Sequence, residues 1–129
     1  MLIMVVDDEV DMIDLFKQRF RKEIKEGLVN FVFHTSAEQA LQDLKSQVNP
    51  DLVLILSDIN MPGMNGLELL RILKKEVPNI KVMLVTAYGD DENYQQAMRY
   101  GADGFINKPI DFNALKNKCI EVLGGDKRD

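Results

Sequence analysis

Residues 52–66 are LVLILSDINMPGMNG, and this stretch decides the fold. Its first five residues are aliphatic without a break, which is typical of a β-strand buried on both faces of a parallel sheet. The run ends at Ser57 and Asp58, and Met61-Pro62-Gly63 then forces a turn before a new apolar pattern begins. A buried strand that brings an aspartate to a turn and a following helix is one unit of an α/β fold.

Similar apolar runs occur on both sides of this stretch. They predict five strands, at Leu2–Val6, Val29–His34, Leu52–Ser57, Ile80–Val85 and Gly104–Ile106. After each strand, apolar residues recur at three- and four-residue steps, which predicts an amphipathic helix. Five strand–helix repeats with short connections predict an α/β fold of the (βα)5 type, a doubly wound parallel sheet with helices on both faces.

Local signals set the helix ends. The first helix is expected to run unbroken from Val10 to Ile24 and to stop at Gly27. Thr35 and Glu38 have the spacing of a capping box for the second helix, and Asp111 is placed to cap the last one. The last helix is expected to turn Cys119 and Ile120 toward the core, where a thiol is inert.

The composition limits the class of protein. The 129 residues suit one domain, expected over residues 1–123 with a flexible tail at 124–129 and no effector domain. The net charge is −5 and no long basic run is present, so we expect no direct binding of nucleic acid. No aliphatic run approaches the ~18 residues of a membrane span and no secretory signal precedes the first strand, so we expect a cytoplasmic protein.

Polar side chains collect where the predicted strands end. Asp7 and Asp8 follow the first strand, and Asp58, Thr86 and Lys108 follow the third, fourth and fifth. Ligands bind at the carboxyl ends of the strands in open α/β sheets, so these side chains are expected to face one crevice. Three carboxylates there would repel one another, and a hard divalent cation would relieve that repulsion. Mg²⁺ suits carboxylates and phosphate oxygens, and Mn²⁺ is the alternative ion.

Four blocks of sequence carry a resemblance to a known family. They are Asp7-Asp8, DINMPGMNG at 58–66, VTA at 85–87 and GADGFINKP at 101–109. With these blocks in this order, the chain resembles the receiver domain of two-component response regulators. The resemblance implies a flavodoxin-like sheet with strand order 2-1-3-4-5. It also implies a signalling switch that takes a phosphoryl group from a histidine kinase or histidine phosphotransfer protein, assisting only its own phosphorylation and dephosphorylation.

The resemblance assigns roles to single residues. Asp58 would be the phosphoacceptor, and Lys108 would pair with a phosphoryl oxygen and precede a cis peptide bond to Pro109. The implied metal ligands are Asp7 (through water), Asp8, Asp58 and Asn60 (through its main-chain carbonyl).

The resemblance also implies a switch. The Thr86 hydroxyl would move to the phosphoryl group, and the Phe105 ring would turn inward. The fourth helix, fifth strand and fifth helix would then bind a downstream protein or a missing effector domain. Phe105 stands where tyrosine is more frequent, and Tyr88 lies where the family tunes dephosphorylation.

Other classes of protein fit the acidic residues less well. A hydrolase of the haloacid dehalogenase type is rejected, since it needs Asp-x-Asp after the first strand and this chain has Asp7-Asp8-Glu9. The acidic residues alone would otherwise be a helix cap. Two alternatives stay open: an interaction module that works without phosphorylation, and a receiver cut from a longer regulator or hybrid kinase. Pro50 lies eight residues before Asp58, about two more than the family pattern, and an even insertion preserves the facing of strand residues.

Overall fold

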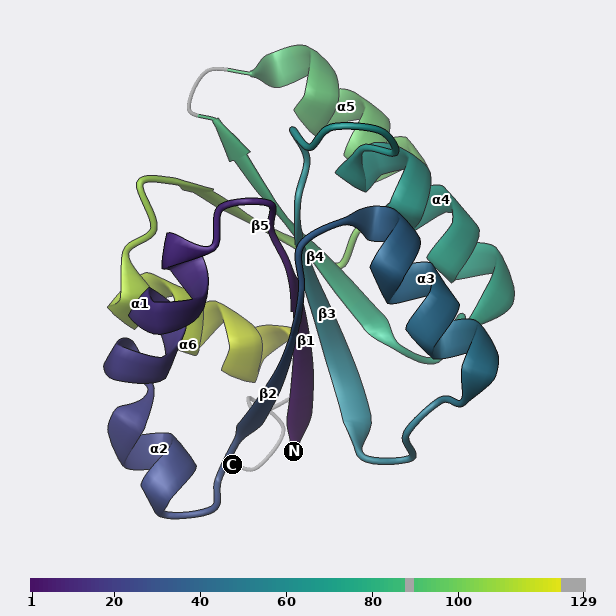
Figure 1. Cartoon of the computed structure of the whole chain (residues 1–129). Coiled ribbons are helices and arrows are strands. Elements are labelled where there is room, and N and C mark those ends of the chain that lie inside the picture. Colours follow the sequence, from purple (N-terminus) through teal and green to yellow (C-terminus); the bar gives the residue numbers. More distant parts are fainter. Residues whose placement is uncertain (88–89, 124–129) are drawn as a thin grey trace.

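The computed structural model describes residues 1–87 and 90–123. Tyr88, expected to tune dephosphorylation, and residues 124–129, expected to form a tail, lie outside the described residues. Five parallel strands form one sheet in the order β2-β1-β3-β4-β5 (Figure 1), which confirms the predicted fold. The strands are β1 (Leu2–Val6), β2 (Asn30–His34), β3 (Leu52–Asp58), β4 (Lys81–Ala87) and β5 (Gly104–Lys108).

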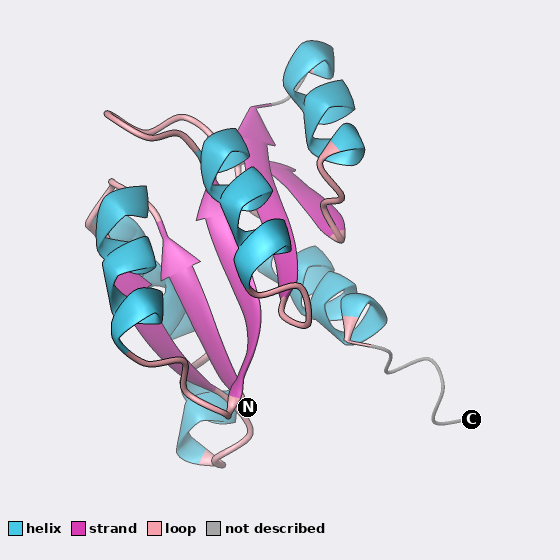
Figure 2. Ribbon diagram, turned by 90° about the vertical axis from the view of Figure 1, so that its right-hand side faces the viewer, coloured by secondary structure: helices cyan, strands magenta, loops and turns pink. Residues whose placement is uncertain are grey.

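Helices cover both faces of this sheet. The described part of the chain contains α1 (Asp11–Arg19), α2 (Arg21–Lys25), α3 (Ala37–Ser46), α4 (Gly66–Glu76), α5 (Asp91–Arg99) and α6 (Phe112–Val122). Helices α3, α4 and α5 pack on one face, and Figure 2 turns this layer toward the viewer. Helices α1, α2 and α6 pack on the other face around a cluster of phenylalanines. The core therefore has two layers, one on each side of the central strands.

The first predicted helix is in fact two helices. Phe20 ends α1 with φ −104° and ψ 16°, and α2 begins at the next residue. Its ring is buried, 5.9 Å from the Phe16 ring and 5.0 Å from the Phe31 ring, so aromatic packing decides the backbone here rather than helix periodicity. The predicted stop at Gly27 is confirmed, with a φ of 74° that closes the end of α2.

Two other local predictions need correction. The side chain that caps α3 is Ser36, which accepts a hydrogen bond from the Gln39 N–H at 3.1 Å, and not Thr35. Ile120 is 45% exposed, whereas Cys119 beside it is buried. The inward stripe of α6 therefore passes through Cys119 and leaves Ile120 on the solvent side. The cap of α6 by Asp111 is confirmed by its bonds to Asn113 N–H and Ala114 N–H.

Strand β3 absorbs extra length near its start. Leu2 pairs with Leu52, but the next residue, Ile3, pairs with Leu54, so Val53 is an additional residue in β3. This bulge shifts the register of β3 against β1 by one residue. Beyond the bulge the pairing is regular, and Asp58 lies opposite Val85 at the end of the strand.

Candidate functional site

The candidate site lies at the carboxyl ends of the central strands. Asp7 follows β1 directly and its N–H donates to the His34 carbonyl at the end of β2. Asp58 is the last residue of β3, and Lys108 is the last residue of β5 and pairs in register with Ala87 of β4. The fold thus brings together side chains that are distant in the chain: Lys108 Nζ lies 2.7 Å from Asp58 Oδ2, 50 residues away, and 3.5 Å from Glu9 Oε1, 99 residues away.

Three carboxylates gather at the centre of this site. One oxygen from each of Asp7, Asp8 and Asp58 lies within 4.8 Å of the other two. Asp58 is 2% exposed and Asp7 is 5% exposed, whereas Asp8 is open to solvent. Such a set of oxygen donors fits a hard cation, and carboxylates at these separations repel one another without one.

The surroundings of Asp7 disfavour its charged form, mainly through burial. Burial raises the pKa of Asp7 to about 6, a hydrogen bond from the Glu9 N–H at 2.8 Å opposes the rise, and the Asp58 charge adds to it. The position of Asp7 therefore disfavours a negatively charged carboxylate in the absence of a cation. The site fits Mg²⁺, which Asp7, Asp8 and Asp58 would hold.

Lys108 supplies the positive charge of the site. Its Nζ donates to Asp58 Oδ2 at 2.7 Å and lies 3.5 Å from Glu9 Oε1. Partial burial lowers the pKa of Lys108, but the bond to Asp58 and the charges of Asp58, Asp7 and Glu9 outweigh it, so the pKa is raised overall. The peptide bond between Lys108 and Pro109 is cis.

The loop after Asp58 is held close to it. Asn60 N–H donates to Asp58 Oδ1 at 3.3 Å, and Gly66 N–H donates to the Ile59 carbonyl at 2.9 Å. A Cβ at Gly66 would lie 2.2 Å from the Asp58 carbonyl oxygen, so only glycine fits at the start of α4. Gly66 belongs to one of the four sequence blocks, but its role could not be predicted, because this contact depends on how the loop closes.

A second contact on this loop was missed by sequence reasoning. Glu38 Oε2, in the first turn of α3, accepts a hydrogen bond from Met64 N–H at 3.0 Å. This bond is the main reason that the pKa of Glu38 is lowered. The sequence pattern indicated only a capping role for Glu38, and no local signal points to a partner 26 positions away.

Thr86 and Phe105 lie on one pocket beside the acidic cluster. The pocket has a volume of about 480 Å³ and is lined by both residues together with Tyr94 of α5. Thr86 is buried, and its hydroxyl has no hydrogen-bond partner among the described residues. The Phe105 ring packs against the Tyr94 ring with the ring centres 4.5 Å apart and the ring planes tilted by 42°. A buried hydroxyl with unused hydrogen-bonding capacity and the Phe105 ring therefore line the same pocket.

His34 and Cys119 lie outside this site. His34 is the last residue of β2, and its Nε2 lies 3.0 Å from Oδ2 of Asp43 in α3. Cys119 is buried on α6, and burial raises the pKa of its thiol to about 11. Neither side chain is among the acidic cluster.

Comparison with known proteins agrees with this geometry. The family model of the response regulator receiver domain matches residues 3–120, and the chain belongs to this family. It is 34% identical over 123 residues to Sporulation initiation phosphotransferase F of Bacillus subtilis, covering 94% of this chain and 92% of that protein. A CheY-like receiver domain from Methanospirillum hungatei is 30% identical with a TM-score of 0.83, over 98% of this chain and 96% of that chain.

Some relatives are much longer than this chain. It is 35% identical over 125 residues to the Glycerol metabolism activator of Pseudomonas putida, which covers 96% of this chain but 54% of that protein. It spans 17% of the response regulator FleR of Pseudomonas aeruginosa. Phosphorylation and binding of Mg²⁺ at an acidic pocket are typical of the receiver family. Within residues 1–87 and 90–123, every helix is too short or too polar to cross a bilayer.

Proposed function

We propose that Asp58 accepts a phosphoryl group from a phosphohistidine on a histidine kinase or phosphotransfer protein. The observation that carries the proposal is a carboxylate that is 2% exposed and lies between two further aspartates and a lysine. Burial shields the acyl phosphate from water, and the surrounding charges hold the donor phosphate in place. The chain acts as a cytoplasmic signalling switch and not as an enzyme with a separate substrate.

The transfer is a displacement at phosphorus. An oxygen of Asp58 forms the new bond to phosphorus while the bond to the donor imidazole nitrogen breaks, and the electron pair returns to that imidazole. Lys108, already 2.7 Å from Asp58, pairs with a phosphoryl oxygen and offsets its charge. Asp8, Asp58 and the Asn60 carbonyl would hold Mg²⁺ directly and Asp7 would hold it through water; when bound, the ion would supply positive charge to the same group.

The surface beside Lys108 suits the phosphodonor. An apolar pocket of about 460 Å³ adjoins it, lined by Met12 and Leu15 of α1 and by Pro109 and Ile110 after β5. A partner helix that buries apolar side chains here brings its phosphohistidine over Asp58.

The signal leaves through the α5 side. After phosphorylation, the Thr86 hydroxyl gains an acceptor on the phosphoryl group, and the Phe105 ring moves into the pocket that the two residues share. Tyr94 and Met98 of α5 are 42% and 52% exposed, which gives that face apolar side chains for a downstream protein or an effector domain. The output surface therefore comprises α5, β5 and α6.

Intact mass after incubation with acetyl phosphate and Mg²⁺ tests the phosphoacceptor. The wild type should gain one phosphoryl group, and Asp58→Asn should gain none. Asp103→Asn is the matched control, because Asp103 also pairs with a lysine but lies at the opposite end of the sheet. Equal labelling of Asp58→Asn would refute the assignment, and partner binding without any labelling would favour the interaction module.

The variant Thr86→Ala tests the switch. It should still be labelled on Asp58, yet show smaller chemical-shift changes across 90–100 and 104–115 than the wild type. Shifts equal to those of the wild type throughout both segments would remove Thr86 from the switch.

A further inference from the structure

The edge of the sheet at β2 is built differently from its centre. Within the described residues, β2 pairs with β1 alone, so its other side is an open edge. Asn30 N–H donates to the Met1 carbonyl, and the His34 carbonyl accepts from Asp7 N–H. Alternate residues of a strand face opposite sides, so Phe31 and Phe33 turn their N–H and C=O groups outward. These groups are free to pair with another strand.

A groove with a positive rim adjoins this edge. Its volume is about 440 Å³, and it lies between β2 and the helices α1 and α2. The floor is apolar and the rim is basic, and the lining residues are Lys17, Arg21, Ile24, Lys25, Asn30, Phe31 and Phe33. The groove contains no acidic side chain, although the whole chain has a net charge of −5. The positive charge is therefore local to this edge.

The three cations of the rim have no ion-pair partner in the part of the chain that the structure describes. Lys17, Arg21 and Lys25 follow one another at four-residue steps and are exposed. Lys17 and Lys25 lie in the last turns of α1 and α2, where a cation favours the helix, whereas Arg21 lies at the start of α2, where a cation does not. Lys17 Nζ lies 5.9 Å from the centre of the Phe33 ring, at the border between rim and floor.

The spacing of the cations matches that of an added strand. Four residues of a helix advance about 6 Å along its axis, and this is the step from Arg21 to Lys25 within α2. Two residues of a strand, which carry side chains on the same face, advance about 6.7 Å. Helices α1 and α2 run alongside β2 in the opposite direction (Figure 1). Acidic side chains at alternate positions of a strand beside β2 would therefore each meet one cation, with their aliphatic stems over Phe31 and Phe33.

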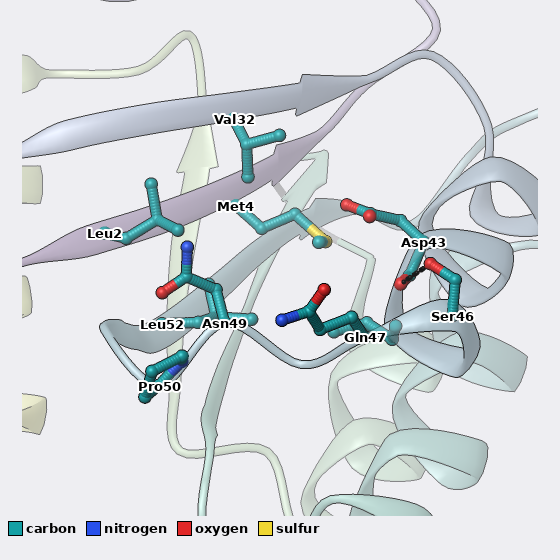
Figure 3. A pocket seen from close by; sticks show the side chains of 10 residues that line it. Leu2, Met4, Val32, Asp43, Ser46, Gln47, Asn49, Pro50 and Leu52 are labelled. Atoms are coloured by element: carbon teal, nitrogen blue, oxygen red, sulfur yellow. Dashed lines mark hydrogen bonds between the residues drawn. The ribbon is translucent and has the colours of Figure 1, made fainter.

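The opposite face of β2 is also hollowed. A pocket of about 400 Å³ lies under the end of α3, and Figure 3 shows Leu2, Met4, Val32 and Leu52 on its walls. Its polar lining comes from the Asp43 carboxylate, the Ser46 hydroxyl and the amides of Gln47 and Asn49. The two faces of this edge thus differ, since one groove is lined by three cations and the other by mixed polar and apolar side chains with a single carboxylate.

We propose that the β2 edge binds an extended segment of another protein that carries acidic residues at alternate positions and apolar residues between them. The segment pairs with the outward backbone groups of Phe31 and Phe33 as an added strand. Its carboxylates face the Lys17–Arg21–Lys25 rim, and its apolar side chains face the Val32 side. This surface lies at the sheet edge opposite β5 and is independent of phosphoryl transfer at Asp58.

Peptide titrations followed by amide chemical shifts test the proposal. The probe is a capped nonapeptide of alternating Glu and Val, and it should shift the amide signals of Phe31 and Phe33. A peptide of the same composition with all Glu residues in one block should bind at least about tenfold more weakly, because only alternation matches the rim. Equal binding of the two peptides would overturn strand addition.

Charge reversal on the rim provides the second test. The triple variant K17E/R21E/K25E should bind the alternating peptide about tenfold more weakly or worse. The matched control K45E/K75E/K81E reverses three exposed lysines elsewhere and should bind within about twofold of the wild type. Equal losses in both variants, or unchanged binding by the rim variant, would overturn the proposal.

Two further measurements separate strand addition from a weakened helix and from self-association. The variant K17Q/R21Q/K25Q removes the three positive charges without introducing negative ones. Its affinity for the alternating peptide should fall between those of the wild type and K17E/R21E/K25E. This variant keeps the proposal testable if K17E/R21E/K25E does not fold. Sedimentation equilibrium should find the wild type monomeric. A dimer that the rim substitutions dissociate would assign this edge to a second copy of the chain and overturn the proposal.

Discussion

The two ends of the sheet each hold a lysine–aspartate pair, and the pairs look alike by distance. At the amino-terminal ends of the strands, Lys74 Nζ lies 2.5 Å from Asp103 Oδ2. At the carboxyl ends, Lys108 Nζ lies 2.7 Å from Asp58 Oδ2. The distance alone would give both pairs the same role.

The charges around the two pairs separate them. Asp103 also accepts a hydrogen bond from Val82 N–H at 2.8 Å, so one carboxylate is matched by one ammonium and one amide. Asp58 shares Lys108 with Asp7 and Glu9, whose charges also act on that lysine. A pair with a balanced charge ties α4 to β4, whereas a pair within a surplus of negative charge is available for a cation and a phosphate. This surplus supports our placing the proposed phosphorylation site at the carboxyl ends of the strands.

Replacing a glycine at each end gives the largest expected contrast. Gly66→Ala should lower the free energy of unfolding by about 3 kcal/mol or more, because the new Cβ would lie 2.2 Å from a backbone oxygen. Gly104→Ala should lower it by about 1 kcal/mol or less, because there the nearest atoms, at 3.1–3.3 Å, belong to side chains that can move. Urea unfolding measures both, and equal losses would show that the Asp58 loop is free to shift.

The pH dependence of stability should differ between the two ends. The pKa of Asp7 is about 6 in the folded chain against 3.8 for the ordinary group, so the folded state binds the extra proton between these values. In the absence of Mg²⁺, this group therefore lowers stability as pH rises from about 4 to about 7. Asp7→Asn should be more stable than the wild type by about 2 kcal/mol at pH 7 and equal to it near pH 4.

Asp103→Asn is the control for this pH series, since it should lose stability at both pH values by removing the partner of Lys74. A wild type and an Asp7→Asn variant with parallel pH profiles would mean that burial and the Asp58 charge do not raise the pKa of Asp7 in the folded chain.

Binding of Mg²⁺ should stabilise the folded chain through the carboxyl end of the sheet alone, by less than the changes above. At a Mg²⁺ concentration ten times its Kd, the wild type should gain about 1.4 kcal/mol of stability. Asp8→Asn should reduce this gain more than Asp7→Asn, because the expected ligation is direct for Asp8 and through water for Asp7. Asp103→Asn should keep the full gain. Thermal unfolding with and without Mg²⁺ decides this, and an undiminished gain in both acidic variants would return Asp7 and Asp8 to the role of a helix cap.

The smallest effect is expected at the loop that follows Asp58. Glu38→Ala removes the acceptor of Met64 N–H, so hydrogen exchange of that amide should become faster. Glu38→Gln keeps an oxygen in the same place and should retain most of the protection. Unchanged exchange in Glu38→Ala would show that the loop does not depend on α3.

Most of the fold was predictable because strong signals lie within each segment. The apolar run before Asp58 and the acids after β1 mark buried strands that end at one edge, and the sheet order is as expected. The break at Phe20 was not predictable, since it depends on rings from α1 and β2 that meet only in the folded chain. The bulge at Val53 likewise depends on the pairing of β3 with β1.

The candidate site divides in the same way. Asp7, Asp8, Asp58 and Lys108 could be placed together from the topology alone, and the structure places them so. The role of Gly66 could not, because it follows from a 2.2 Å approach to the backbone. Asp103 belongs to one of the four sequence blocks, but the sequence did not indicate its partners. The ion pair with Lys74 and the hydrogen bond from Val82 N–H form only in the folded chain.

The single cysteine gives the chain a built-in kinetic probe. Cys119 is 9% exposed, and with a pKa of about 11 its thiolate fraction at neutral pH is on the order of one in ten thousand. A thiol reagent therefore reacts with Cys119 chiefly when α6 opens from the sheet, so the labelling rate measures how often that helix detaches. A reporter cysteine introduced on an exposed surface would react far faster and be modified selectively, with the native cysteine left in place.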